Sequence, residues 1–95
     1  MLPARLHQPG EERIYTFAFA EKLRPGDALI GTATVTADAG ITVISTRSDL
    51  DRGLVSATLS GGVNGSDYRV ECMHDTNDGE ILIVAMILEV RRLDQ

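Results

Sequence analysis

The strongest candidates for chemistry in this chain are the carboxylates of Asp75–Glu80, in the sequence DTNDGE. Calcium in proteins takes oxygen ligands of this kind, but a calcium loop spreads them over about twelve residues and ends in a bidentate glutamate. This segment is too short for that pattern. The run Asn77-Asp78-Gly79 between two apolar stretches is typical of a hairpin turn. We therefore predict a turn and no metal site, with a calcium loop as the alternative.

No other residues have the spacing of a catalytic or metal-binding set. His7 and His74 form no pair with metal-ligand spacing, and both are expected to be exposed surface histidines. Asp49 and Asp51 are typical of a solvated loop. The serines lie in no G-x-S-x-G motif, and no lysine or helix follows the glycines at 61, 62 and 65 to make a phosphate loop. We therefore expect a protein that is not an enzyme and that binds no cofactor.

Size and charge narrow the class of partner. The chain has 95 residues, enough for one domain, and a net charge of −5. Nucleic acids and anionic membranes attract clustered Lys and Arg, so we expect neither as a partner. Cys72, the single cysteine, cannot form an internal disulfide and is expected to be a packed thiol. The first residues do not resemble a signal peptide, and the apolar run Ile81–Leu88 is too short for a membrane helix, so the chain is expected in the cytoplasm.

Short strands must position these residues. Alternation of polar and apolar residues, with Gly, Pro, Asn and Asp at the breaks, predicts strands over residues 13–19, 28–37, 41–46, 54–60, 67–73 and 80–92. A short edge strand at 47–51 would be a seventh. Residues 1–12 are expected to be a flexible N-terminal arm, and residues 13–93 a single domain. Six to seven such strands predict the all-β class and an antiparallel Greek-key β-sandwich, Ig-like or fibronectin III-like.

One tyrosine supports this fold type. In Greek-key sandwiches, a tyrosine at the start of a late strand buries its ring and hydrogen-bonds its hydroxyl to backbone a few residues upstream. Tyr68 follows Leu59 and Gly65 in LSGGVNGSDYRVEC, which resembles the tyrosine corner of fibronectin type III domains. The glycines at 61, 62 and 65 are expected to let the chain arch over the ring. Four residues are expected to define the fold, namely Tyr68, Leu59, Gly65 and the inward-facing Tyr15.

The final strand, EILIVAMILEV, is apolar on both faces. If Val84, Met86, Leu88 and Val90 face the core, the residues that face outward are Ile81, Ile83, Ala85 and Ile87. An exposed apolar row is an aggregation hazard unless something covers it. The arm or a loop could cover the row, or the row could be a subunit interface. We predict the interface.

Taken together, these segments resemble a family of small immunoglobulin-like virion proteins of tailed phages and prophages, of the fibre–tail adaptor type. The resemblance rests on QPGEERIYTFAF, KLRPGDALIG, AGITVIS and LSGGVNGSDYRV in this order, and on the closing NDGE turn and LEV strand end. It covers roughly residues 8–93. The tryptophans typical of the family's first loop and second strand are absent here.

The resemblance implies a non-enzymatic structural role in a phage or prophage virion or tail, exercised through protein–protein packing. It implies other virion proteins as partners, a homo-oligomer, and passage from the host cytoplasm into the virion. The alternative is an accessory β-sandwich module that binds a carbohydrate or a protein. Carbohydrate sites usually present exposed aromatic side chains, whereas the four aromatic residues here all fall on expected inward faces.

Overall fold

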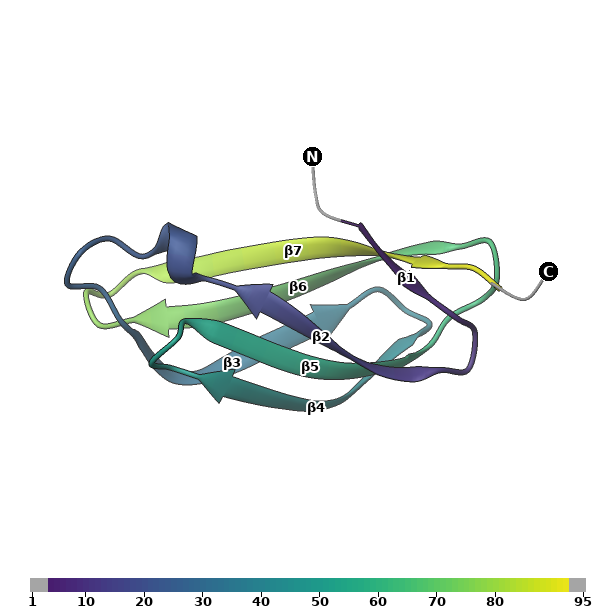
Figure 1. The fold of residues 1–95 in the computed structure, drawn as a ribbon, viewed down its shortest axis with the longest axis horizontal. Coiled ribbons are helices and arrows are strands. Elements are labelled where there is room, and N and C mark those ends of the chain that lie inside the picture. Colours follow the sequence, from purple (N-terminus) through teal and green to yellow (C-terminus); the bar gives the residue numbers. More distant parts are fainter. Residues whose placement is uncertain (1–3, 93–95) are drawn as a thin grey trace.

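The computed structural model describes residues 4–92, which form two β-sheets packed face to face (Figure 1). The strands are β1 (Ala4–His7), β2 (Glu12–Ala18), β3 (Leu29–Ala37), β4 (Ile41–Asp49), β5 (Leu54–Gly61), β6 (Asp67–Thr76) and β7 (Ile81–Val90). A short 3-10 helix, η1 (Ala20–Lys22), follows β2. The predicted all-β sandwich is confirmed.

The strand order is that of an immunoglobulin-like sandwich. One sheet has the order β1-β7-β6-β3 and the other the order β2-β5-β4. Strands β2, β5 and β4 correspond to B, E and D of an immunoglobulin domain, and β3, β6 and β7 to C, F and G. All paired strands are antiparallel except β1, which runs parallel to β7. The chain changes sheet between β1 and β2, between β2 and β3, between β3 and β4, and between β5 and β6, which makes the connections Greek-key.

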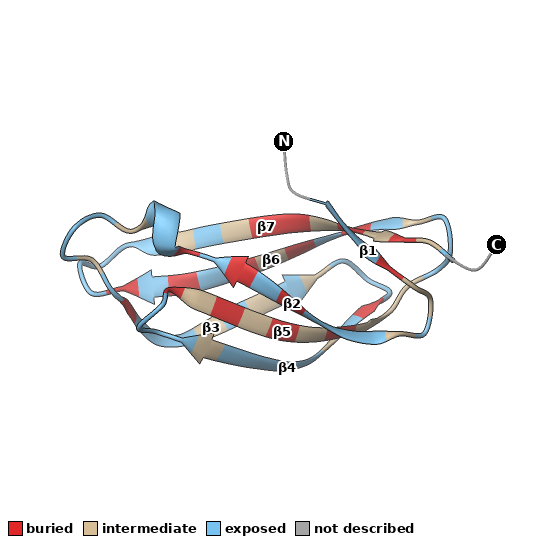
Figure 2. Cartoon of the chain, viewed as in Figure 1, coloured by how far each residue is buried: buried red, intermediate tan, exposed pale blue. Residues whose placement is uncertain are grey.

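The core lies between the sheets and is built from every second residue of the strands. In β5 the buried residues are Val55, Ala57 and Leu59, and their neighbours are partly exposed. Figure 2 shows the same alternation as red bands along β5 and β6. Because side chains point to opposite faces along a strand, this pattern gives each sheet one apolar face, and the two faces pack on each other.

The N-terminal segment differs from the prediction. Residues 1–12 were expected to form a flexible arm, whereas Ala4–His7 pairs in register with Ile87–Val90 and adds a fourth strand to its sheet. The side chain of His7, the last residue of this strand, is buried. A four-residue strand that pairs with the opposite end of the chain leaves almost no local signal, and the prolines on either side suggest a loop. Residues 1–3 of the expected arm lie outside the described residues.

Two other strands also differ in detail. The extra edge strand expected at 47–51 is the end of β4, which continues through a register shift between Val43 and Ser45. The predicted strand over 28–37 is β3, but it is interrupted: Gly31 has a φ of +76° and lies within the irregular stretch between Ile30 and Thr34. A positive φ of this size suits glycine and is typical of a β-bulge.

Candidate interaction surface

The tyrosine corner is present. The Tyr68 hydroxyl accepts a hydrogen bond of 2.9 Å from the backbone N–H of Val63, and the Tyr68 ring is buried. The glycine that lies against the ring is Gly40, where an added Cβ would come within 2.9 Å of the ring carbon Cε2 of Tyr68. The predicted hydrogen bond is therefore correct, but the sequence did not identify the glycine that makes room for the ring.

The glycines named in the sequence pattern have other roles. A Cβ at Gly62 would lie 2.6 Å from Cγ2 of Val90, so this glycine lets the β5–β6 connection approach β7. Gly65 has a φ of +91°, and its N–H donates a 2.8 Å hydrogen bond to the carbonyl of Val90. Both glycines therefore bring the β5–β6 connection into contact with the end of β7, and neither makes room for the Tyr68 ring.

Tyr15 and His7 form a buried polar pair, which corrects the prediction that His7 is exposed. The Tyr15 hydroxyl lies 2.7 Å from Nδ1 of His7 and 3.2 Å from the carbonyl oxygen of Leu6. Leu59 is fully buried in the same core. His7 was expected at the surface because the strand that carries it inward was not predicted. The pair links β1 of one sheet to β2 of the other.

His74 is also buried, again contrary to the prediction. The expected strand ended at residue 73, but β6 runs on to Thr76, and its alternation carries His74 inward. Its ring packs edge-on against Phe19, with 6.1 Å between the ring centroids. On the same face, Cys72 is buried as predicted, and burial raises the pKa of its thiol to about 11. A thiol with so high a pKa carries little of the nucleophilic thiolate near neutral pH.

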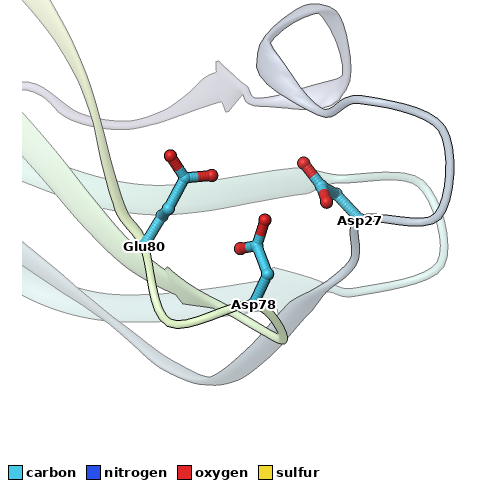
Figure 3. Close-up of side chains that lie close together, drawn as sticks. All are labelled: Asp27, Asp78 and Glu80. Atoms are coloured by element: carbon cyan, nitrogen blue, oxygen red, sulfur yellow. The ribbon is translucent and has the colours of Figure 1, made fainter.

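Three carboxylates gather where the β6–β7 turn meets the loop before β3. The carboxylates of Asp27, Asp78 and Glu80 each place an oxygen within 4.8 Å of the others (Figure 3). The guanidinium of Arg24 pairs with Asp27 at 3.2 Å, with Asp78 at 3.0 Å, and with Glu80. The Thr76 hydroxyl donates a hydrogen bond to Asp78 and holds the pKa of that carboxyl below its usual value.

Through these ion pairs, the cluster connects the loop before β3 to the β6–β7 turn. Arg24 supplies the positive charge that the three carboxylates need, and the hydrogen bond from Arg24 to Asp27 raises the pKa of the guanidinium. The turn itself is as predicted, with a φ of +88° at Gly79 and a 3.2 Å hydrogen bond from its N–H to the carbonyl of Thr76. The sequence pattern did not indicate the contribution of Arg24 and Asp27, because they lie far from the turn in the chain.

The predicted interface row lies on the outer face of the four-stranded sheet, but only its first half is exposed. The exposed fraction is 64% for Ile81 and 45% for Ile83, whereas Ala85 is buried and Ile87 is half-buried. On β6, the residues aligned with Ala85 and Ile87 are Glu71 and Arg69, which form an ion pair of 3.1 Å beside them. β1 aligns with the row only from Ile87 onward. Neither β1 nor the ion pair covers the first two isoleucines.

Two neighbours that the sequence reasoning left out extend this surface. Met73 of β6 aligns with Ile83, and Ile30 of β3 aligns with Asp75, which in turn aligns with Ile81. All four apolar side chains are exposed. We call this set, Ile30, Met73, Ile81 and Ile83, the outer patch. Alternation along β3 and β6 places Ile30 and Met73 on outward faces, so the signal for them was available in the sequence.

The outer patch contrasts with the aromatic residues. Tyr15, Phe17, Phe19 and Tyr68 are all buried, as their strand positions predicted. No aromatic side chain of this chain is therefore placed to stack on a sugar ring. The described residues also include no helix that is long and apolar enough to cross a membrane.

An immunoglobulin-like sandwich that buries its aromatic side chains and exposes a cluster of apolar side chains on the outer face of its four-stranded sheet has the architecture of a structural interaction domain. The family comparison makes this specific. Residues 7–89 match the family described as podophage GP4 fiber-tail adaptor protein gp77, and the chain belongs to that family. It is thus a structural, tail-associated phage protein, as the resemblance implied. No curated protein matches the sequence.

Proposed function

We propose that this chain connects a tail fibre to the tail of a podophage particle, and that it acts by protein–protein packing without catalytic turnover. Its partners are other virion proteins, and it moves from the host cytoplasm into the particle during assembly. Membership of the fibre–tail adaptor family supports the setting. The observation that carries the packing mechanism is the outer patch, because its four apolar side chains are exposed on one sheet face.

The outer patch has the composition of the centre of an interface. Fully burying an isoleucine side chain contributes about 1.5–3 kcal/mol, so a partner that covers Ile81 and Ile83 gains substantially from these two residues. Interface centres are poor in charge and have polar rims. The Arg69–Glu71 ion pair borders the patch on β6, and Asp75 separates Ile30 from Ile81, so the part that is free of charge is Met73, Ile81 and Ile83. We infer that the contact residues are Ile81 and Ile83, with Ala85 and Ile87 following them along β7.

This mechanism is tested by charge substitution on the patch. Ile83→Asp should keep the fold, because the side chain points to solvent, but should lower the amount of the protein in purified particles at least tenfold. The matched control is Ile14→Asp, because Ile14 is 67% exposed on β2 of the other sheet. Circular dichroism and thermal melting verify the fold of both variants. Normal incorporation of a folded Ile83→Asp variant would contradict the proposed contact surface.

A further inference from the structure

The long edge of β7 is only partly covered. β1 pairs with Ile87–Val90 on the side away from β6, and no strand within residues 4–92 pairs with residues 81–86 on that side. In Figure 1 the middle of β7 runs along the upper rim of the molecule, between η1 and β1. β7 thus has an open stretch of edge next to a stretch that already accepts a strand.

Two hydrogen bonds show which backbone groups point to this open edge. The N–H of Val90 donates to the carbonyl of Ser66, on the β6 side, whereas the N–H of Arg91 donates to the carbonyl of His7, on the β1 side. Backbone groups alternate in direction along a strand, so the odd-numbered residues of β7 point away from β6. The N–H and C=O groups of Ile81, Ile83 and Ala85 therefore point to the open edge, free to pair with another strand.

Residues 81–86 of this edge carry no charge, proline or bulge of their own. Natural edge strands avoid pairing with other chains through charged side chains, prolines, bulges or very short length. Residues 81–86 are all apolar, and β6 and β7 pair without a register shift from Asp67↔Glu89 to Asp75↔Ile81. The stretch is therefore a regular, uncharged template for an added strand.

We propose that a second copy of the chain pairs its own β7 antiparallel with this edge, about a two-fold axis at Ile83, and joins the two four-stranded sheets into one continuous sheet. The arrangement does not depend on which fibre or tail protein the chain binds. In this register Ile83 faces Ile83 of the second copy, and Ile81 faces Ala85 of the second copy. It is the register that pairs all the open N–H and C=O groups of Ile81, Ile83 and Ala85.

Side chains and charges favour the same register. Every cross-strand pair between residues 81 and 85 is apolar, so no like charges meet. The isoleucines of the two outer patches would then form one apolar surface across the junction of the two β7 strands. The register ends with Ala85 opposite Ile81 of the second copy, so the β6–β7 turn that precedes Ile81 in the second copy lies next to the start of β1, where Ala4 and Arg5 align with Ile87 and Leu88. An arginine of one copy thus comes near the turn of the other, where three carboxylates share one arginine.

The test is a proline at Ile83, with sedimentation equilibrium as the measurement. The N–H of residue 83 points to the open edge, so Ile83→Pro removes both hydrogen bonds between the two copies of residue 83 and keeps the pairing with β6. The matched control is Ile14→Pro on edge strand β2. The N–H of Phe19 donates to Gly53, so odd residues of β2 face β5, and the N–H of Ile14 points away from it. The wild type and Ile14→Pro should dimerise, whereas Ile83→Pro should weaken the dimer at least a hundredfold.

Amide hydrogen exchange gives a second measurement that needs no variant. The amides of Ile81, Ile83 and Ala85 should become protected as the wild-type concentration rises. A wild-type chain that stays monomeric at about 1 mM would overturn the proposal. A folded Ile83→Pro variant that still dimerises would overturn it too, as would a dimer in which these three amides exchange as fast as in the monomer. None of these results affects the family role, which is tested in whole particles.

Discussion

At the scale of single residues, Tyr68 closes the corner between β5 and β6 through its hydroxyl. We expect Tyr68→Phe to keep the buried ring and to lose the hydrogen bond from Val63. The free energy of unfolding should fall by about 1 kcal/mol, the usual net value of such a bond. Urea unfolding followed by circular dichroism measures the change. An unchanged midpoint and slope would show that the hydroxyl does not hold the corner.

The buried thiol of Cys72 makes stability depend on pH. Its pKa rises from an ordinary value near 9.0 to about 11 in the folded chain, because burial disfavours the thiolate. Below pH 9 the thiol keeps its proton in both the folded and the unfolded chain, and its contribution to the stability of the fold is complete. Between pH 9 and 11 the unfolded chain loses the proton first, so stability falls as pH rises. Cys72→Ala should remove this part of the decline. If the two stability curves are parallel over this range, the thiol does not contribute.

At the scale of elements, β1 is held to the sandwich by one buried side chain. His7 fills a core position and contacts the Tyr15 hydroxyl, whereas its neighbour Leu6 is exposed. His7→Ala should lower the free energy of unfolding by about 2 kcal/mol, because it leaves a cavity and removes a partner of Tyr15. Leu6→Ala should cost less than about 0.5 kcal/mol.

Amide exchange at Arg91 reports on β1 directly, because this N–H donates to the carbonyl of His7. We expect faster exchange at Arg91 in His7→Ala and little change in Leu6→Ala. Equal exchange in both variants would mean that the strand is held by its backbone pairing alone.

Local alternation was sufficient to predict most elements. β2 and β5 bury alternate side chains, and their strands were predicted within a few residues. β1 could not be found in this way, because its only pairing is with the far end of the chain. The bulge at Gly31 and the extension of β6 to Thr76 depend on neighbouring strands. The burial of both histidines follows from β1 and from this extension, and so was missed with them.

In the candidate site, too, the sequence predicted what depends on one strand and missed what depends on its neighbours. Ile81 and Ile83 were predicted as outward residues from the pattern of one strand. The half-burial of Ile87 depends on neighbouring strands, because Arg69 of β6 aligns with it on one side and Ala4 of β1 on the other. The Arg24 cluster likewise brings together a loop and a turn from distant parts of the chain.

At the scale of the whole molecule, the fold separates two kinds of surface. The outer face of the four-stranded sheet carries the apolar patch, and the acidic cluster lies at the end of the sandwich where β6 turns into β7. The buried aromatic residues hold the two sheets together and leave no stacking platform outside. This arrangement supports our proposal that the chain binds by apolar contact, as a part that is built once into a particle.

Mass spectrometry of gradient-purified particles tests whether the chain is part of the virion. We predict that the chain is present at a fixed ratio to the tail proteins, and that it stays with the tails when they are separated from heads. Particles that are complete and infectious but lack the chain would contradict its place in the virion.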